Sequence, residues 1–216
     1  MISANKEQKL YITEIQKKIM DAFLVVANES NSGTRITMNE IANKVRMTPQ
    51  AIYRKHFKSV IEISDTIRDE TTDDIIKAMD EAFVKDKNLP ILEAIAREVI
   101  PVMYKYRFAI RIFYHYTEYG DWFSYIGDGF VECARPFLKR DLSDVSIARE
   151  SLLRLYVRII IQILLQWVAE DSPAPPSIYC DEFLELCEML HLSDYFDRSY
   201  FCLLYTSPSP RDRSVS

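Results

Sequence analysis

The sequence predicts an all-α protein of about nine helices, in which a three-helix helix-turn-helix unit precedes a larger helical domain. Three observations predict this class. Only four of the 216 residues are glycine, so the chain cannot build the glycine-rich phosphate loops of doubly wound α/β folds. Apolar residues recur three and four positions apart, which is the period of a helix face. Thr and Ser also stand where helix starts need a capping oxygen.

The sequence of the N-terminal 64 residues predicts a series of short helices. The first ends before residues 28–33, and its apolar face combines Leu10, Ile12, Ile15, Ile19, Ala22, Phe23 and Val26. The second begins at Thr37, because Thr followed three residues later by Glu40 is the capping-box arrangement. The third begins at Thr48, whose hydroxyl caps a helix with Pro49 in its first position, where a missing N–H costs nothing.

Only Val45, Arg46 and Met47 separate the second and third helices. Two short helices joined by about three residues form a helix-turn-helix. Ser59, followed by Glu62 three residues later, opens a fourth and longer helix.

Residues 65–201 are also expected to be helical, with breaks at 88–90, 120–121, 141–144 and 172–177. The most apolar helix runs from about residue 145 to 170, roughly 39 Å at 1.5 Å per residue. Its polar residues form one line, Arg154, Arg158, Gln162 and Gln166. The longest charge-free run, residues 159–169, has eleven residues, against about 20 needed to cross a bilayer, so we expect no membrane span.

A helix that is apolar on most sides must be covered on most sides. We expect part of this helix to meet a second subunit, together with a last helix at about 178–192; burial wholly within one chain is the alternative. The residues expected at this dimer interface are Leu153, Tyr156, Val157, Ile160, Leu164, Trp167, Leu184 and Cys187.

Charge divides unevenly along the chain. Residues 1–64 hold 10 Lys and Arg against 6 Asp and Glu, whereas residues 65–201 hold 15 against 25. A basic N-terminal part on an acidic body suggests that an anionic partner meets only the N-terminal part.

Residues 19–63 resemble the N-terminal DNA-binding domain of the TetR family of transcriptional regulators. The matching residues are Ile19, Ala22 and Phe23, then Thr37, Ile41 and Ala42, then the run from Thr48 to Tyr53, and finally His56, Phe57 and Ser59. The resemblance implies domains at 1–64 (DNA binding) and 65–201 (effector binding and dimerisation). It also implies a two-fold dimer on a palindromic operator, most simply a repressor, released by a small molecule.

The sequence departs from the family pattern at three positions. Arg46 stands where the turn usually has glycine, and a left-handed backbone there costs about 1 kcal/mol. One extra residue separates Tyr53 from Phe57, and Val60 replaces a lysine common after the fourth helix's cap. These departures bear on how His56, Lys58 and the fourth helix meet the phosphates.

The DNA contacts can also be argued from chemistry. At the start of the third helix, Gln50 suits a bidentate pair to adenine and Ala51 suits a thymine methyl. Hydroxyls, cations and helix ends suited to phosphates surround them. For Tyr53 the alternative is a core aromatic, and for His56 a structural histidine. The expected DNA-binding set is Thr37, Thr48, Pro49, Gln50, Ala51, Tyr53, Arg54, Lys55, His56 and Lys58.

Ten aromatic residues fall within residues 104–125, and they suit either a lipophilic or cationic effector or a plain core. The expected effector residues are Tyr104, Phe108, Phe113, Tyr116, Tyr119, Trp122 and Phe123.

Other function classes find little support in the sequence. No metal spacing or nucleophile elbow occurs, so neither an enzyme nor a cofactor is expected. A DNA-bound adaptor whose body binds a protein partner is the alternative. The cysteines lack C-x-x-C spacing and the first residues carry no secretion signal, so we expect a reduced, cytoplasmic protein.

Residues 202–212 read CLLYTSPSPRD, which resembles the conceptual translation of a transposon-type sequencing adapter. We therefore expect residues 1–201 to be the genuine chain and residues 202–216 to be an adapter-derived tail. Resequencing the gene from genomic DNA tests this expectation.

Overall fold

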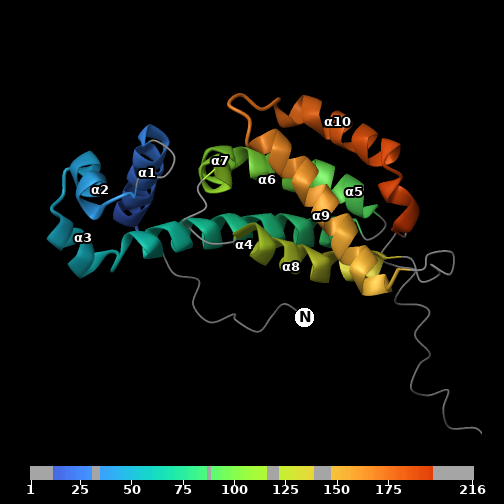
Figure 1. The fold of residues 1–216 in the computed structure, drawn as a ribbon, viewed down its shortest axis with the longest axis horizontal. Coiled ribbons are helices and arrows are strands. Elements are labelled where there is room, and N and C mark those ends of the chain that lie inside the picture. Colours follow the sequence, from blue (N-terminus) through green and yellow to red (C-terminus); the bar gives the residue numbers. More distant parts are fainter. Residues whose placement is uncertain (1–11, 31–34, 87–88, 116–121, 139–146, 197–216) are drawn as a thin grey trace, which may run out of the picture. The chain divides into compact units, whose positions relative to one another are not determined.

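Helices account for nearly all regular structure in the computed structural model, which describes residues 12–30, 35–86, 89–115, 122–138 and 147–196 (Figure 1). For residues 83–85 and 122–125 the description covers the backbone only. Within these ranges the one β-type contact is an isolated bridge between Leu138 and Phe196. The chain is therefore all-α, as predicted. The expected adapter-derived tail lies outside the described residues.

The first three helices begin at capping residues. Helix α1 (Glu14–Glu29) starts after Thr13, whose side chain and that of Gln16 form a capping box. Helix α2 (Met38–Val45) has the predicted box between Thr37 and Glu40. Helix α3 (Pro49–Lys55) starts after Thr48, whose hydroxyl accepts from the Ala51 N–H at 3.2 Å. The predicted starts of α2 and α3 are confirmed, whereas α1 begins after Ile12 because Thr13 caps it.

The turn between α2 and α3 is left-handed. Arg46 has φ 55° and ψ 43°, and its N–H donates to the carbonyls of Ala42 and Asn43. The Met47 N–H donates to the Ala42 carbonyl at 3.0 Å. These bonds satisfy the last carbonyls of α2 and turn the chain directly into α3. A side chain at this backbone conformation costs about 1–2 kcal/mol relative to the right-handed one.

Helix α4 (Val60–Lys85) starts where predicted, with the Glu62 N–H donating to the Ser59 hydroxyl at 3.0 Å. Its middle, Arg68–Asp74, contains no apolar residue. Thr71 and Thr72 are buried there, and each hydroxyl donates at 2.8 Å to the carbonyl four residues earlier. One turn before this stretch, Ser64 is fully buried, and its hydroxyl has no hydrogen-bond partner among the described residues.

The remaining helices follow in order. Helices α5 (Ile91–Ala94) and α6 (Ile100–Lys105) are joined through a π-helical turn, Ile95–Val99, into one continuous helix. Then come α7 (Arg107–His115), α8 (Trp122–Ala134), α9 (Arg149–Val168) and α10 (Pro176–Met189). With the α5–α6 run counted once, the described residues hold nine α-helices, in agreement with the prediction.

The chain divides into two compact units. The first contains residues 1–73 and 106–122, and the second contains residues 74–105 and 123–216. Helix α7 therefore belongs to the first unit. There the rings of Phe23 and Phe113 stack with centroids 6.4 Å apart, and the Arg111 guanidinium donates to Asn28 Oδ1 at 2.7 Å. The units divide within α4, whereas a functional boundary at residue 64 stays a prediction.

An aromatic stack joins the last two helices in the second unit. The rings of Trp167 and Tyr179 lie 4.1 Å apart and nearly parallel. The Trp167 indole N–H donates to the Ala174 carbonyl at 3.0 Å, and the Tyr179 hydroxyl donates to the Ile163 carbonyl at 3.1 Å. Both polar groups are satisfied, so the stack contributes apolar burial without an unpaired donor.

Helix α9 is shorter than predicted. It has 20 residues, about 30 Å, because Ala148, at φ −54° and ψ 132°, is not helical and the helix starts only after it. Arg154, Arg158, Gln162 and Gln166 form the predicted exposed line. Of the described helices, α9 alone is long and apolar enough to span a membrane. Core helices of soluble proteins have the same length and composition, and 44% of its most apolar 18-residue stretch is buried within the chain.

Replacing Arg46 by glycine should stabilise the protein by about 1 kcal/mol, because glycine adopts the left-handed conformation without a Cβ penalty. Urea unfolding measures the difference. Arg46→Ala is the matched control: it removes the cation but keeps the Cβ, and its stability should equal that of the natural chain. A destabilised glycine variant would contradict a strained turn.

Candidate nucleic-acid interface

Helix α3 packs against the protein on one side and exposes its other side to solvent. Ile52 is fully buried, and Phe57, just beyond the helix, is also buried. The side chains of Gln50, Arg54 and Lys55 are exposed. Two apolar anchors thus fix a helix of seven residues whose outer surface is polar and basic.

All ten residues expected to meet DNA reach the surface at least in part. Tyr53 is 48% exposed, so it is not a core aromatic, and its hydroxyl remains available to a partner. His56 is half-buried and caps the end of α3 with its backbone N–H, which donates to the Ile52 carbonyl at 2.9 Å. Pro49 and Ala51 are half-buried beside the exposed Gln50.

The two capping threonines differ in what they leave for a ligand. The Thr37 hydroxyl donates to Glu40 Oε2 at 2.7 Å, and the Thr37 N–H donates to the same oxygen at 2.8 Å. These bonds hold the pKa of the Glu40 carboxyl below its usual value, the side-chain bond contributing most. The Thr48 hydroxyl only accepts a bond among the described contacts, so its own proton can go to a phosphate. Thr48 is therefore the better phosphate donor.

Gln16 links α1 to the end of α3 and was not among the residues expected to matter for the interface. Its side-chain NH2 donates to the His56 carbonyl at 3.3 Å, while its Oε1 accepts from the Thr13 N–H at 3.0 Å. The capping signal was readable, because Thr13 and Gln16 have the spacing of a capping box. The contact with His56 spans 40 positions and had no local signal. Gln16 thus positions the C-terminal end of α3.

Cations dominate the surface after α3. Arg54 and Lys55 form its last turn, Lys58 is exposed, and α3 has no acidic residue in its first turn. The Glu62 carboxylate accepts from the Lys58 backbone N–H. No described residue forms an ion pair with the Lys58 ammonium group, which is left for an outside anion.

The structure places the expected effector residues in different surroundings. Phe113 is buried against Phe23, with the Arg68 guanidinium 5.9 Å from its ring. Phe108 is 37% exposed under Arg111, and Tyr104 stacks on Trp167 at 6.1 Å in the second unit. Tyr116 and Tyr119, and the side chains of Trp122 and Phe123, lie outside the described part of the chain.

Most of the residues expected at the dimer interface are covered within one chain, and their place at an interface stays a prediction. Six of the eight are buried within the chain and so pack its own core: Leu153, Val157, Ile160, Leu164, Trp167 and Cys187. Tyr156 and Leu184 are half-buried. The apolar side chains that α9 and α10 expose are Leu155, Ile178, Leu186 and Met189. Both sets have helical spacing, and the sequence pattern did not show which set faces inward.

The described cysteines, Cys133, Cys180 and Cys187, are free thiols. Burial raises the pKa of Cys133 to about 11 and that of Cys187 to about 12. Both thiols are therefore protonated at neutral pH and are poor nucleophiles. No group of three or more His, Cys, Asp or Glu able to hold a metal lies within the described ranges.

Comparison with protein families finds no match to this sequence, and comparison with curated proteins finds none. Among solved structures, the chain is similar to the crystal structure of the TetR family repressor AlkX from Dietzia sp. strain DQ12-45-1b, implicated in biodegradation of n-alkanes. The two are 12% identical with a TM-score of 0.46, and the match covers 82% of this chain and 97% of that one.

Thr37→Ala should cost about 1 kcal/mol of stability near pH 7, because it removes the cap of α2. The lowered pKa of the Glu40 carboxyl makes this stabilisation depend on pH. The part that Glu40 contributes is present above its unfolded pKa and is lost as pH falls through its folded pKa. The stability difference between variant and natural chain should therefore shrink on acidification, measured by urea unfolding. Asn39→Ala, at an exposed site on the same helix, serves as control. A pH-independent difference would remove Glu40 from the cap.

Proposed function

We propose that this chain is a sequence-specific regulator of transcription that binds double-stranded DNA through α3. The observation that carries the proposal is the two-sided character of α3: Ile52 anchors it, while Gln50, Arg54 and Lys55 are presented to solvent. A helix held on one side and polar on the other suits insertion into the major groove. Footprinting on the DNA that flanks its own gene tests the proposal directly.

The exposed residues divide into two roles. Gln50 specifies sequence by a bidentate pair to adenine, with Ala51 against a thymine methyl. Thr48, Tyr53, Arg54, Lys55, His56 and Lys58 hold phosphates and set the orientation without reading bases. Thr37 contributes chiefly by capping α2. The basic N-terminal part supplies the long-range attraction to DNA.

The wider activity follows from the resemblance to TetR regulators. The chain acts in the cytoplasm as a homodimer on a palindromic operator, represses transcription, and releases DNA when a small lipophilic or cationic molecule binds its body. It uses no cofactor, has no enzymatic activity and does not enter membranes. Thermal-shift screening with and without operator tests the effector, and a body that no compound stabilises would argue against it.

Gln50→Ala should weaken operator binding by roughly 1–3 kcal/mol and relax the preference at one base pair in each half-site, since the bidentate pair is lost. Lys58→Ala should weaken binding to all sequences alike. It should also reduce the slope of log affinity against log salt concentration by about one, because one phosphate contact is lost. Titration of operator and random duplex at several salt concentrations separates the two. Unchanged selectivity in the Gln50 variant would remove this residue from base recognition.

Dimerisation through α9 and α10 predicts that Leu155→Glu and Met189→Glu yield monomers that stay folded, because both side chains are exposed within one chain. Light scattering after gel filtration gives the mass, and circular dichroism verifies the fold. Asn39→Glu, at an exposed site on α2, is the matched control: it adds the same charge away from α9 and α10 and should leave the dimer intact. Dimers in both leucine and methionine variants would place the interface elsewhere.

A further inference from the structure

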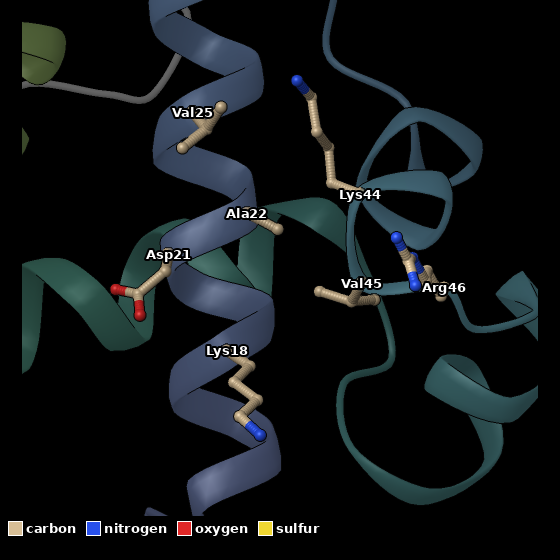
Figure 2. A pocket seen from close by; sticks show the side chains of 7 residues that line it. All are labelled: Lys18, Asp21, Ala22, Val25, Lys44, Val45 and Arg46. Carbon is tan, nitrogen blue, oxygen red and sulfur yellow. The ribbon is translucent and has the colours of Figure 1, made fainter.

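A shallow groove lies between α1 and the C-terminal end of α2. It encloses about 410 Å³, opens broadly to solvent, and is lined by Lys18, Asp21, Ala22, Val25, Lys44, Val45 and Arg46 (Figure 2). Nothing in the proposed DNA contacts uses these residues. The lining is more apolar than polar, which distinguishes it from a plain stretch of charged surface.

The apolar part of the groove comes from both helices. Ala22 and Val25 belong to α1 and Val45 to α2, and Val25 remains 38% exposed. An exposed β-branched side chain on the wall of a hollow can bury further area when a partner's apolar side chain enters. The groove is therefore a place where an apolar side chain gains contact.

The charged part of the groove is cationic. Lys18, Lys44 and Arg46 line it, and the single carboxylate, Asp21, points away from α2 (Figure 2). The Lys44 ammonium already pairs with Glu29 at 2.7 Å. No ion pair is formed by Lys18 or Arg46 with any other described residue. These two cations remain for an outside anion.

The backbone at Arg46 supplies an independent reason to look here. This residue holds a left-handed conformation that glycine would adopt at lower cost. A side chain kept at a strained position points to a use for that side chain. The fold needs only the turn, so the cation itself is the feature to explain.

We propose that this groove docks an acidic amphipathic helix of a partner protein, whose apolar face packs on Val25 and Val45 over the buried Ala22 while its carboxylates meet Lys18 and Arg46. An amphipathic helix in an apolar groove is a recurring mode of recognition. The apolar floor disfavours a phosphate, and the open shape disfavours an enclosed small molecule. This inference goes beyond the proposed function and does not require that the chain bind DNA.

The test titrates the full chain into a fluorescent acidic peptide that carries leucine at helical positions i, i+3, i+4 and i+7 and glutamate elsewhere. Anisotropy should show saturable binding. Lys18→Gln and Arg46→Gly should each weaken it roughly two- to five-fold, and Val25→Glu by on the order of ten-fold or more, through like-charge repulsion in the groove. Lys17→Gln, one position away on α1 and outside the groove, should have no effect.

Further variants and peptides distinguish helix docking from unfolding and from phosphate binding. Arg46→Gly is expected to be more stable than the natural chain, so its loss of binding cannot come from unfolding. Peptides with serine for leucine, or lysine for glutamate, should bind weakly. Equal binding by the Lys17, Lys18 and Arg46 variants would overturn the proposal. So would displacement by random duplex DNA with matching losses of DNA affinity in these variants, which would make the groove a phosphate site.

Discussion

The left-handed backbone at Arg46 is the constraint on which the rest of the N-terminal unit depends. It closes α2 through bonds from the Arg46 and Met47 N–H groups and redirects the chain within two residues into the Thr48 cap of α3. The buried Ile52 then fixes the rotation of α3, and Gln16 holds its far end through the His56 carbonyl. Without this turn the exposed face of α3 would have no defined direction.

Local features could be predicted from the sequence and distant ones could not. The caps at Thr37 and Ser59 were predictable because Glu follows each three positions later, and the cap at Thr48 because Pro49 follows it in the first helical position. The start of α9 was not, since Ala148 offers no capping side chain. Which residues of α9 meet a second subunit stays a prediction, because α9 has apolar residues on several sides and helical spacing alone does not say which side the protomer covers. The bond from Gln16 to His56 depends on the tertiary fold.

Helix α7 changes how the aromatic segment is to be understood. Its Phe113 belongs to the same compact unit as α1 and packs against Phe23, so this ring serves the core of the N-terminal unit. Tyr104, only nine positions earlier in sequence, stacks on Trp167 in the other unit. One aromatic cluster in the sequence thus supplies two separate cores. Of the three effector candidates whose side chains are described, only Phe108 is exposed.

The polar middle of α4 has a consequence for local stability. Between Ile67 and Ile75 no apolar side chain supports the helix, and the Thr71 and Thr72 hydroxyls compete for main-chain carbonyls. Thr and Asp are also weak helix formers. The middle of this helix therefore relies on main-chain hydrogen bonds and on two buried threonines rather than on apolar side chains. This polar stretch coincides with the division between the two compact units, which falls within α4.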